Sequence, residues 1–401
     1  RGPSQPVRLQ SQRLQHMTAM IPDVVAAMDR AIGPGPFSLH EPRLSRLESE
    51  FVQQCLDSTF VSSVGPFVDR FEAELAAYTG AGYAIATVNG TSALHVALIL
   101  AGVLPGDEVL VPALTFVATA AAVTYAGAIP VFIDSEFEGL GVDPVALAVW
   151  LKRSTVLEGG QLVNRTTGRR ISAVVPMHTF GHPCDLEGLK AVADDFRLAL
   201  VEDAAESLGS YRDGRHTGTT GRLGILSFNG NKIITTGGGG AILTDDPDLA
   251  RRAKHLTTTA KVPHRWEYTH DEVGFNYRLP NINAALGCAQ LERLPEFLES
   301  KRRLFDRYSE AFAALADVRV LREPRGCRSN YWLQTLILDP GAATQRDEVL
   351  EALNGAGYMA RPAWKLIPTL APYAKSPCAP LPVAAELATR IVNVPSSAGL
   401  A

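Results

Sequence analysis

Apolar runs of strand length alternate with segments of helical periodicity over the first two thirds of the chain. After the run at 83–88, for example, apolar residues recur at helical spacing from Leu94 to Ala101 and stop at Gly102. Most of the strand-like runs are separated in this way by a helix, which predicts an α/β fold with a mostly parallel sheet between helices. The predicted strands are YAIATV (83–88), EVLV (108–111), IPVFID (129–134), ISAVVPM (171–177), RLALVED (197–203), GILSF (224–228) and GAILT (240–244).

The pattern changes after about residue 290. A charged amphipathic segment, QLERLPEFLESKRRLFDRYSEAFAAL, predicts one long helix, and a strand-like run at 331–338 and a further helix follow it. This part is expected to form a smaller α+β domain over residues 286–401, beside a large domain over 21–285 that includes N-terminal helices. Residues 1–20 do not begin with Met and show no apolar signal segment, so they are interpreted as a tail outside the fold.

Composition is that of an ordinary globular protein. Hydrophobic residues make up 46% and charged residues 20%, and the formal charge of −4 gives no general attraction to nucleic acid or to an anionic membrane. No apolar run approaches the roughly 18 residues that a membrane span needs. The five cysteines are scattered without a C-x-x-C pair, which argues against a zinc ribbon or a disulfide framework and fits the cytoplasm. The basic triplet KRR at 301–303 is interpreted as the solvated face of the long helix.

Candidate chemistry lies directly after the predicted strands, because ligands of an open parallel sheet bind outside the carboxyl ends of its strands. After the first strand, NGTSAL opens a helix. Gly90, Thr91 and Ser92 offer N–H groups, hydroxyls and close backbone approach to an anion such as a phosphate, although they also fit a simple helix cap. After the second strand, Phe116 is placed either to stack on a flat ring or to fill the core.

Two further strands end in polar residues. Asp203 closes RLALVED, where a buried carboxylate needs a cation or hydrogen-bond donors, or serves as a cap, and Glu202 is expected to face the other way. Ser227 ends the GILSF strand, and Asn229 and Lys232 follow it. A lone loop lysine is usually solvated, but the four glycines after Lys232 let backbone lie close to a bulky ligand. Because the glycines follow the lysine, a nucleotide P-loop is disfavoured.

Together these residues match the needs of one cofactor, pyridoxal 5′-phosphate (PLP). Its aldehyde condenses with a lysine amine, its phosphate takes N–H and hydroxyl donors, and its pyridine nitrogen takes a carboxylate that keeps the ring protonated. Lys232, the helix start at 90–92 and Asp203 are expected to supply these groups at one edge of the sheet.

The sequence resembles the DegT/StrS-type sugar aminotransferases, PLP enzymes of fold type I, over nearly the whole chain. The matching motifs, in the order that the family has them, are NGTSALHVAL, PGDEVLVPALTFVATA, VEDAAESLG, SFNGNK and GFNYRLPNINAALG. Within the family, SFNGNKIITTGGGG is most similar to aminotransferases of the legionaminic-acid and related pathways. The resemblance implies a fold type I PLP-transferase with a seven-stranded sheet and a smaller C-terminal domain.

The resemblance also implies a role for each matching residue. Lys232 forms the Schiff base with PLP and then moves the proton between cofactor and substrate, while Asp203 pairs with the pyridinium nitrogen and Phe116 stacks on the ring. Glu206 occupies a position near the phenolic oxygen of PLP where many members carry His or Gln. Asn276 reaches the phosphate bound to the neighbouring subunit, which implies a homodimer with shared active sites. The residues implied for the phosphate are Thr91, Ser92 and Ser227.

By the same resemblance, the amino donor is L-glutamate and the acceptor is C4 of a nucleotide-linked 4-keto-6-deoxy sugar with a 2-acetamido group. Two alternatives stay open: an aminotransferase of a cyclitol or other non-nucleotide ketone, and a non-catalytic PLP-fold regulator. A regulator is expected to have lost the lysine or the aspartate, and both Lys232 and Asp203 are present. The sequence does not fix the nucleotide, UDP or GDP.

One histidine pair could suggest a metal site. His178 and His182 are four residues apart, but Gly181 and Pro183 break any helix that would place them on one face, and no third ligand follows. They are interpreted as a loop pair, and no metal site is predicted.

Overall fold

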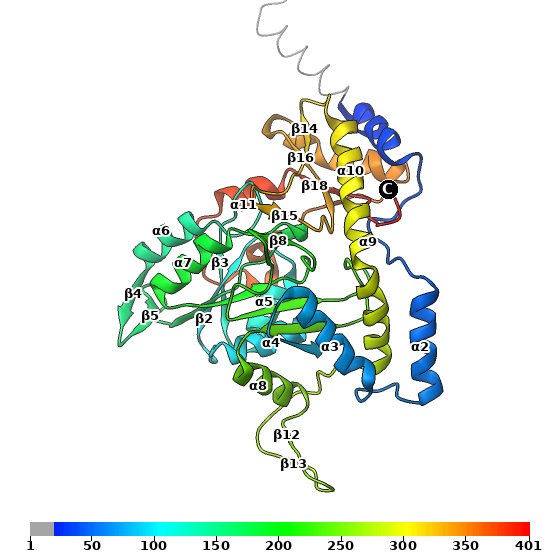
Figure 1. Ribbon diagram of the computed structural model, residues 1–401. Helices are drawn as coiled ribbons and strands as arrows, with labels where there is room; N and C mark the ends of the chain where they lie inside the picture. Colours follow the sequence, from blue (N-terminus) through cyan, green and yellow to red (C-terminus); the bar gives the residue numbers. More distant parts are fainter. Residues whose placement is uncertain (1–19) are drawn as a thin grey trace, which may run out of the picture.

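The sheet predicted from the apolar runs is present in the computed structural model, which describes residues 20–401. Its strand order is β1–β11–β10–β7–β6–β2–β3 (Figure 1). These strands are β1 (Tyr83–Thr87), β2 (Glu108–Pro112), β3 (Ile129–Ile133), β6 (Ile171–Val174), β7 (Ala199–Asp203), β10 (Leu223–Ser227) and β11 (Gly240–Thr244). The five strands from β10 to β3 run parallel, and β11 is antiparallel to both of its neighbours. The predicted α/β fold with a mostly parallel sheet is confirmed.

Helices cover both faces of this sheet, because alternate strand residues point to opposite sides. In β2, Val109 and Val111 pack with α4 and α5, whereas Leu110 packs with α6 and α7. The helices on the first face are α4 (Gly90–Leu100), α5 (Val117–Tyr125) and α8 (Pro247–Thr257). Those on the second face are α3 (Pro66–Thr79), α6 (Pro144–Ser154), α7 (Leu186–Phe196) and the first part of α9 (Asn281–Phe312), with α2 (Arg46–Ser58) packed against α9.

Helix starts follow the capping residues in the sequence. Asn89 caps α4 by accepting a hydrogen bond from the Ser92 N–H group at 2.7 Å, and Asp143 caps α6 by accepting from the Val145 N–H group at 2.8 Å. Pro144 takes the first position of α6, where its missing N–H group costs no helical hydrogen bond. Each cap fixes a helix relative to the strand before it, and at α4 this places a candidate anion site.

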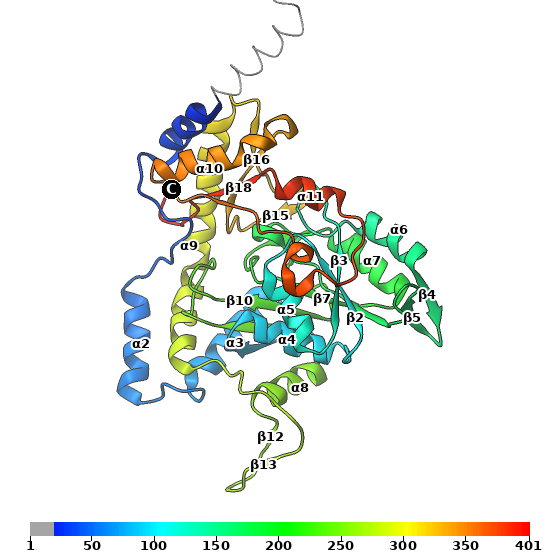
Figure 2. The ribbon, with the colours of Figure 1, turned by 180° about the vertical axis from the view of Figure 1, so that it is seen from behind.

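A second, smaller lobe lies at the far end of α9 (Figures 1 and 2). Its antiparallel sheet has the order β14 (Val318–Val320), β16 (Gln334–Leu338), β18 (Ile391–Val394) and β17 (Arg361–Pro362). α10 (Arg346–Gly355), the distal part of α9 and helical residues 20–32 share one core with this sheet. The predicted boundary between residues 285 and 286 falls inside α9 and stays a prediction, and the predicted tail lies outside the described residues except for Met20.

Short elements connect or extend the two lobes. They are β4 (Thr155–Glu158), β5 (Gln161–Asn164), β8 (Tyr211–Arg212), β9 (Arg215–His216), β12 (Lys261–Val262), β13 (Thr269–His270), β15 (Cys327–Arg328), α11 (Pro382–Ala388) and the 3₁₀ turns η1 (Thr179–Gly181), η2 (Pro340–Gln345), η3 (Ile367–Thr369) and η4 (Ala371–Tyr373). β15 pairs with β8, and the β12–β13 hairpin projects beyond α8 in both views (Figure 2). Within residues 20–401, no helix combines the length and apolar character that a membrane crossing needs.

The interpretation of residues 301–303 as one solvated face is wrong for Lys301. This residue of α9 is fully buried, and its Nζ donates to the carbonyl oxygens of Trp332, at 2.8 Å, and Ser396. Burial lowers the pKa of Lys301 well below its ordinary value. Arg302 is half-buried and pairs with Glu323, while Arg303 is exposed. Successive helical residues are rotated by about 100°, so three neighbours cannot all face solvent on a helix that runs between packed layers.

Candidate active site

A cavity of about 320 Å³ lies at the carboxyl edge of the large sheet, where the chain leaves β1, β2, β7 and β10. This is the edge at which ligands of parallel sheets bind. Most of the residues singled out in the sequence line it: Gly90, Thr91, Phe116, Asp203, Glu206, Ser227, Asn229 and Lys232. Ser92 and Asn276 are not part of its lining. The strand-end rule therefore gathers residues that are up to 142 positions apart (90 to 232) around one cavity.

The start of α4 is the anion-binding wall of this cavity. The Gly90 and Thr91 N–H groups belong to the first turn, which has no partner within the helix, whereas the Ser92 N–H group is taken by the Asn89 side chain. A Cβ atom on Gly90 would lie only 2.9 Å from Cβ of Ser227, so glycine allows the helix to start directly beside β10. Thr91 and Ser227 both line the cavity here, and Ser227 Oγ would lie 3.2 Å from a Cβ atom on Gly90, so this hydroxyl is beside the helix start.

Asp203 is a buried carboxyl group at the floor of the cavity. Its Oδ2 accepts a hydrogen bond from the Thr119 hydroxyl at 2.8 Å, and its Oδ1 accepts from the Ala205 N–H group at 3.2 Å. Burial raises the pKa of Asp203 above its ordinary value, and these neutral donors only partly oppose the effect. A buried carboxyl held by neutral donors can therefore be stabilised further by a cationic group that enters the cavity.

Lys232 is not solvated, which excludes the alternative that a lone loop lysine suggested. Its side chain is 12% exposed, and Nζ lies 3.2 Å from Oε1 of Glu206. On another side, Nζ lies 4.0 Å from the ring centroid of Trp332, within cation–π distance. The backbone holds this position through a turn in which the Lys232 N–H group donates to the Asn229 carbonyl at 3.0 Å. The amine is thus largely shielded from solvent, paired with a carboxyl group and part of the cavity lining.

Glu206 is the carboxyl partner of that amine. Its second oxygen, Oε2, accepts from the Phe180 N–H group at 2.9 Å, and Phe180 itself has left-handed backbone angles (φ 56°, ψ 17°). Burial raises the pKa of Glu206 to about 7, although the charge of Lys232 acts against this rise. The carboxyl group is therefore poised to gain or lose a proton near neutral pH.

Two tryptophans of the second lobe complete the cavity and were missed in the sequence. The Trp332 indole N–H donates to the Asn231 carbonyl at 2.6 Å, which holds its ring over Lys232. Trp364 packs between Phe180, at a ring distance of 4.8 Å, and Phe116, at 6.4 Å. Both lie well beyond Thr244, the end of the last predicted strand of the large sheet, and only their aromatic character beside a strand could have marked them.

Glu202 and the two histidines lie behind the cavity rather than in it. As predicted, Glu202 faces away from Asp203, and it accepts N–H groups of the loop at 218–221. His178 Nε2 lies 3.0 Å from Oε2 of this carboxylate, and its Nδ1 accepts from the Cys184 N–H group. His182 instead packs edge-on against the ring of Tyr331, and burial lowers its pKa to about 3. The two histidines therefore meet different neighbours, as expected for a loop pair.

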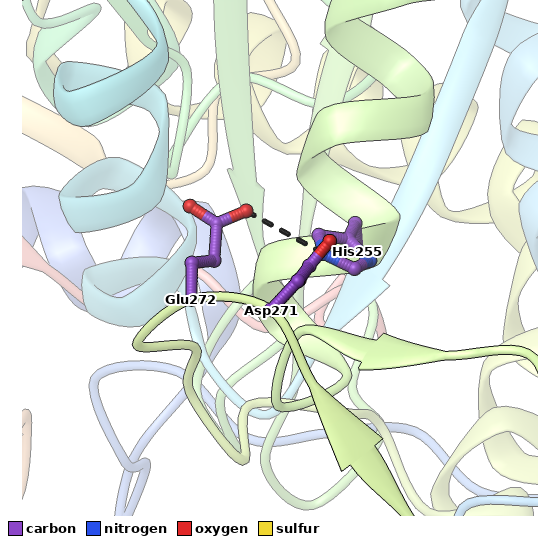
Figure 3. A group of neighbouring side chains, drawn as sticks. All are labelled: His255, Asp271 and Glu272. Carbon is purple, nitrogen blue, oxygen red and sulfur yellow. Dashed lines mark hydrogen bonds and ion pairs between the residues drawn. The ribbon is translucent and has the colours of Figure 1, made fainter.

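A separate polar cluster joins the β12–β13 hairpin to α8 (Figure 3). His255 Nε2 lies 2.7 Å from Oδ1 of Asp271 and 3.4 Å from Oε1 of Glu272. A hydrogen bond to His255 lowers the pKa of Asp271. The Glu272 carboxylate is also bound by both terminal nitrogens of Arg252. Its charge is already balanced by an arginine, so the cluster is best described as an ion-pair anchor for the hairpin.

The cavity has the donor set of a PLP site. It offers an amine, a buried carboxyl without a cation on it, and a helix start with free N–H groups beside two hydroxyls. Fold and site together define an α/β enzyme of the PLP-dependent class.

Comparison with known proteins agrees with this class. The model of the DegT/DnrJ/EryC1/StrS aminotransferase family matches residues 42–401. A GDP-perosamine synthase of Caulobacter vibrioides is 38% identical over 90% of this chain and 94% of its own length. The chain therefore belongs to this family and is a PLP-dependent aminotransferase.

Solved structures show the same architecture. The aminotransferase TlmJ from Streptoalloteichus hindustanus superposes with a TM-score of 0.82 at 29% identity, covering 92% of this chain and 95% of that one. DesI, solved in the presence of its TDP-sugar product, superposes with a TM-score of 0.79 at 32% identity, covering 92% of this chain and 91% of that one.

Proposed function

We propose that this protein transfers the amino group of L-glutamate to C4 of a nucleotide-linked 4-keto-6-deoxy sugar that carries a 2-acetamido group. The observation that carries the proposal is the buried Lys232 amine, which shares one cavity with Asp203 and the start of α4. Support for a nucleotide sugar comes from relatives named for a GDP-linked sugar and from DesI, which was solved with a TDP-sugar.

Each residue of the cavity has a task in this proposal. When bound, PLP supplies an electron sink for the substrate carbon that loses a proton. The N–H groups of Gly90 and Thr91, with the Ser227 hydroxyl, hold its phosphate, and Asp203 keeps the pyridine nitrogen protonated. Phe116 covers the ring. Asn229 closes the turn that directs Lys232 inward.

Lys232 provides the nitrogen that holds the cofactor and, once released, moves the proton at the substrate carbon. The amine acts as a base only when it is neutral. Only 12% of the Lys232 side chain is exposed, so the surrounding residues exclude bulk water from most of it. Trp332 and Trp364 line the cavity as its outer wall, and in this proposal they face the sugar.

The active unit in this proposal is a homodimer in the cytoplasm. Phe116 at the cavity mouth is 49% exposed, and Tyr125 on α5 and Trp266 and Tyr268 on the β12–β13 hairpin are more exposed still. Large exposed apolar side chains of this kind mark interaction surfaces. Asn276 is exposed at the base of the hairpin, where in this proposal the phosphate of the cofactor bound to the partner subunit meets it.

The five cysteines are free thiols, which fits the reducing compartment that this proposal assumes.

Visible absorbance tests the first half of the reaction. The cofactor-free protein is mixed with PLP, and L-glutamate is then added, beside Lys232→Ala and the control Lys152→Ala, whose lysine is exposed on α6. We expect a long-wavelength band that glutamate converts to a shorter wavelength in the wild type and the control, and neither change in Lys232→Ala. A Lys232→Ala protein that responds to glutamate at the wild-type rate would contradict the role of Lys232.

A substrate panel tests the second half. UDP- and GDP-linked 4-keto-6-deoxy sugars, each with and without the 2-acetamido group, are offered to the glutamate-treated enzyme, together with a cyclitol ketone. Return of the long-wavelength band identifies the amino acceptor. Turnover of the cyclitol alone would replace the proposal with the non-nucleotide alternative, and no response to glutamate would favour the regulator.

A further inference from the structure

Lys232 and Glu206 form a closed pair within the cavity. Nζ of Lys232 and Oε1 of Glu206 are 3.2 Å apart, and their side chains are 12% and 2% exposed. The pair carries no net charge as ammonium and carboxylate, which lowers the cost of burying both groups. Whatever removes the charge of one member must therefore change the proton affinity of the other.

The surroundings of Glu206 offer little compensation for a lost partner. Oε2 is held by the Phe180 N–H group, and the other carboxyl group in the cavity, Asp203, raises the pKa of Glu206 by repulsion. Among residues 20–401, the groups that face this carboxyl are thus the Lys232 amine, the Phe180 N–H group and the Asp203 carboxyl group. Without the ammonium, the carboxylate would be buried with a single neutral donor beside it.

We propose that Glu206 is the proton store of Lys232: it takes the proton that the ammonium group gives up when the Lys232 nitrogen bonds to a carbonyl carbon, and it returns this proton when the cofactor leaves the site. The inference rests on the proposed function, in which Lys232 bonds to the aldehyde carbon of PLP. Its consequence is that, as long as Glu206 is ionised, cofactor loading needs no proton exchange between Lys232 and solvent.

The step balances. The ammonium group, the Glu206 carboxylate and an aldehyde give a carbon–nitrogen double bond, one water molecule and a neutral Glu206 carboxylic acid. Two protons of the ammonium nitrogen leave with the aldehyde oxygen as water, the third moves to Oε1, and the total charge stays zero. The neutral acid can then donate a hydrogen bond to an acceptor in the cavity, which a carboxylate cannot do.

The pH dependence of this exchange follows from the state of Glu206 before loading. Its pKa of about 7 in the cofactor-free protein means that the carboxyl is mainly ionised at pH 8 and mainly protonated at pH 6. Loss of the ammonium partner raises this pKa further. At pH 8 the Glu206 carboxylate can therefore accept the proton from Lys232. At pH 6 Glu206 is already protonated, so the proton from Lys232 must go to solvent.

Calorimetry measures this proton directly. PLP is titrated into the cofactor-free full-length protein in two buffers of different ionisation enthalpy, at pH 8 and at pH 6, and the difference in heat gives the number of protons released. We expect Glu206→Gln to release about one proton more than the wild type at pH 8, and the two proteins to agree at pH 6. Equal release at both pH values overturns the proposal.

A matched control is available elsewhere in the chain. Glu72 accepts from Lys254 Nζ at 2.7 Å outside the cavity, so Glu72→Gln removes a lysine-paired carboxylate without touching the site. We expect Glu72→Gln to release as many protons as the wild type at both pH values. Failure of the wild type itself to bind PLP would count against the proposed function, and this result is distinct from equal proton release in proteins that do bind.

Infrared difference spectroscopy covers the case in which Glu206→Gln does not load. On addition of PLP to the wild type at pH 8, we expect a new carbonyl stretch of a protonated carboxylic acid, and no such band in Glu206→Asp if the shorter side chain withdraws from Lys232. A wild-type protein that binds PLP at pH 8 without gaining this band refutes the proton store.

Discussion

Asp203 at the end of β7 and Glu206 just after it lie three residues apart, yet their surroundings give them different tasks. The Asp203 carboxyl group accepts hydrogen bonds from the Thr119 hydroxyl and the Ala205 N–H group, and both of these donors are neutral. Glu206 is already paired with the Lys232 amine in the cofactor-free protein. Two acids of one cavity can thus serve a cofactor nitrogen and a lysine separately, because pKa values follow the immediate partners.

At this scale we predict the outcome of Asp203→Asn. Asparagine keeps the shape of the side chain but carries no charge, so the cofactor should still load while its ring nitrogen loses its counter-charge. We expect the visible PLP band to remain and kcat to fall by about 100-fold or more. Steady-state kinetics with L-glutamate test this, beside Asp194→Asn, whose aspartate is exposed on α7. A kcat near that of the wild type would mean that Asp203 does not serve the ring.

The segment between β10 and β11 shows how an element is shaped around the site. The Phe228 N–H group donates to the Gly239 carbonyl at 2.8 Å, and the Thr236 N–H group donates to the Phe228 carbonyl at 3.0 Å, so the loop that carries Lys232 is closed at its base. Of the glycines after Lys232, Gly239 lines the cavity. Gly240 instead packs on the start of α4, where a Cβ atom would lie 2.5 Å from the Asn89 carbonyl carbon.

Gly240 therefore serves the contact between β11 and α4, whereas the close approach of the glycine backbone to a bulky ligand stays a prediction. We predict that Gly240→Ala pushes the start of α4 away from β11 and weakens PLP binding. The free energy of unfolding should fall by about 1–3 kcal/mol. Urea denaturation and PLP titration measure both effects.

Gly230→Ala is the control for this prediction. Gly230 lies in the same loop, and a Cβ atom there would meet nothing within 4 Å. Its effect on the free energy of unfolding should stay within about 0.5 kcal/mol. Equal effects of the two alanines would mean that the approach of Gly240 to Asn89 is not what places α4.

At the scale of the whole molecule, the cavity depends on both lobes. The large sheet supplies the lysine and the acids, and the second lobe supplies Trp332 and Trp364. Nζ of Lys301 on α9 donates a hydrogen bond to the Trp332 carbonyl oxygen at 2.8 Å. The helix that spans the two lobes therefore also supports the outer wall of the cavity. In the proposed dimer, Phe116, which lines the cavity and is 49% exposed, faces the second copy.

Subunit mixing tests whether two copies share their sites. If Asn276 of one subunit serves the cofactor held by Lys232 of the other, Lys232→Ala and Asn276→Ala should each be nearly inactive. Refolding an equal mixture should restore about a quarter of the wild-type activity, because half of the dimers are mixed and each mixed dimer has one intact site. No recovery in dimers shown to be mixed would place Asn276 and Lys232 in the same subunit's site.

The sequence by itself determined the elements and most of the cavity floor. Periodicity of apolar residues is a local property, so it located the sheet strands and the helices between them. The rule that ligands bind at the carboxyl ends of parallel strands then brought Gly90, Asp203 and Lys232 to one edge without knowledge of any long-range contact.

Only the tertiary structure decided which side chains meet. Trp332 and Trp364 reach the cavity, and Lys301 becomes buried, because the second lobe packs against the first along α9. The pairing of Glu206 with Lys232 likewise depends on two loops that converge in space. Such contacts join residues far apart in the chain, and neither periodicity nor local propensity records them, since they arise from the packing of whole elements.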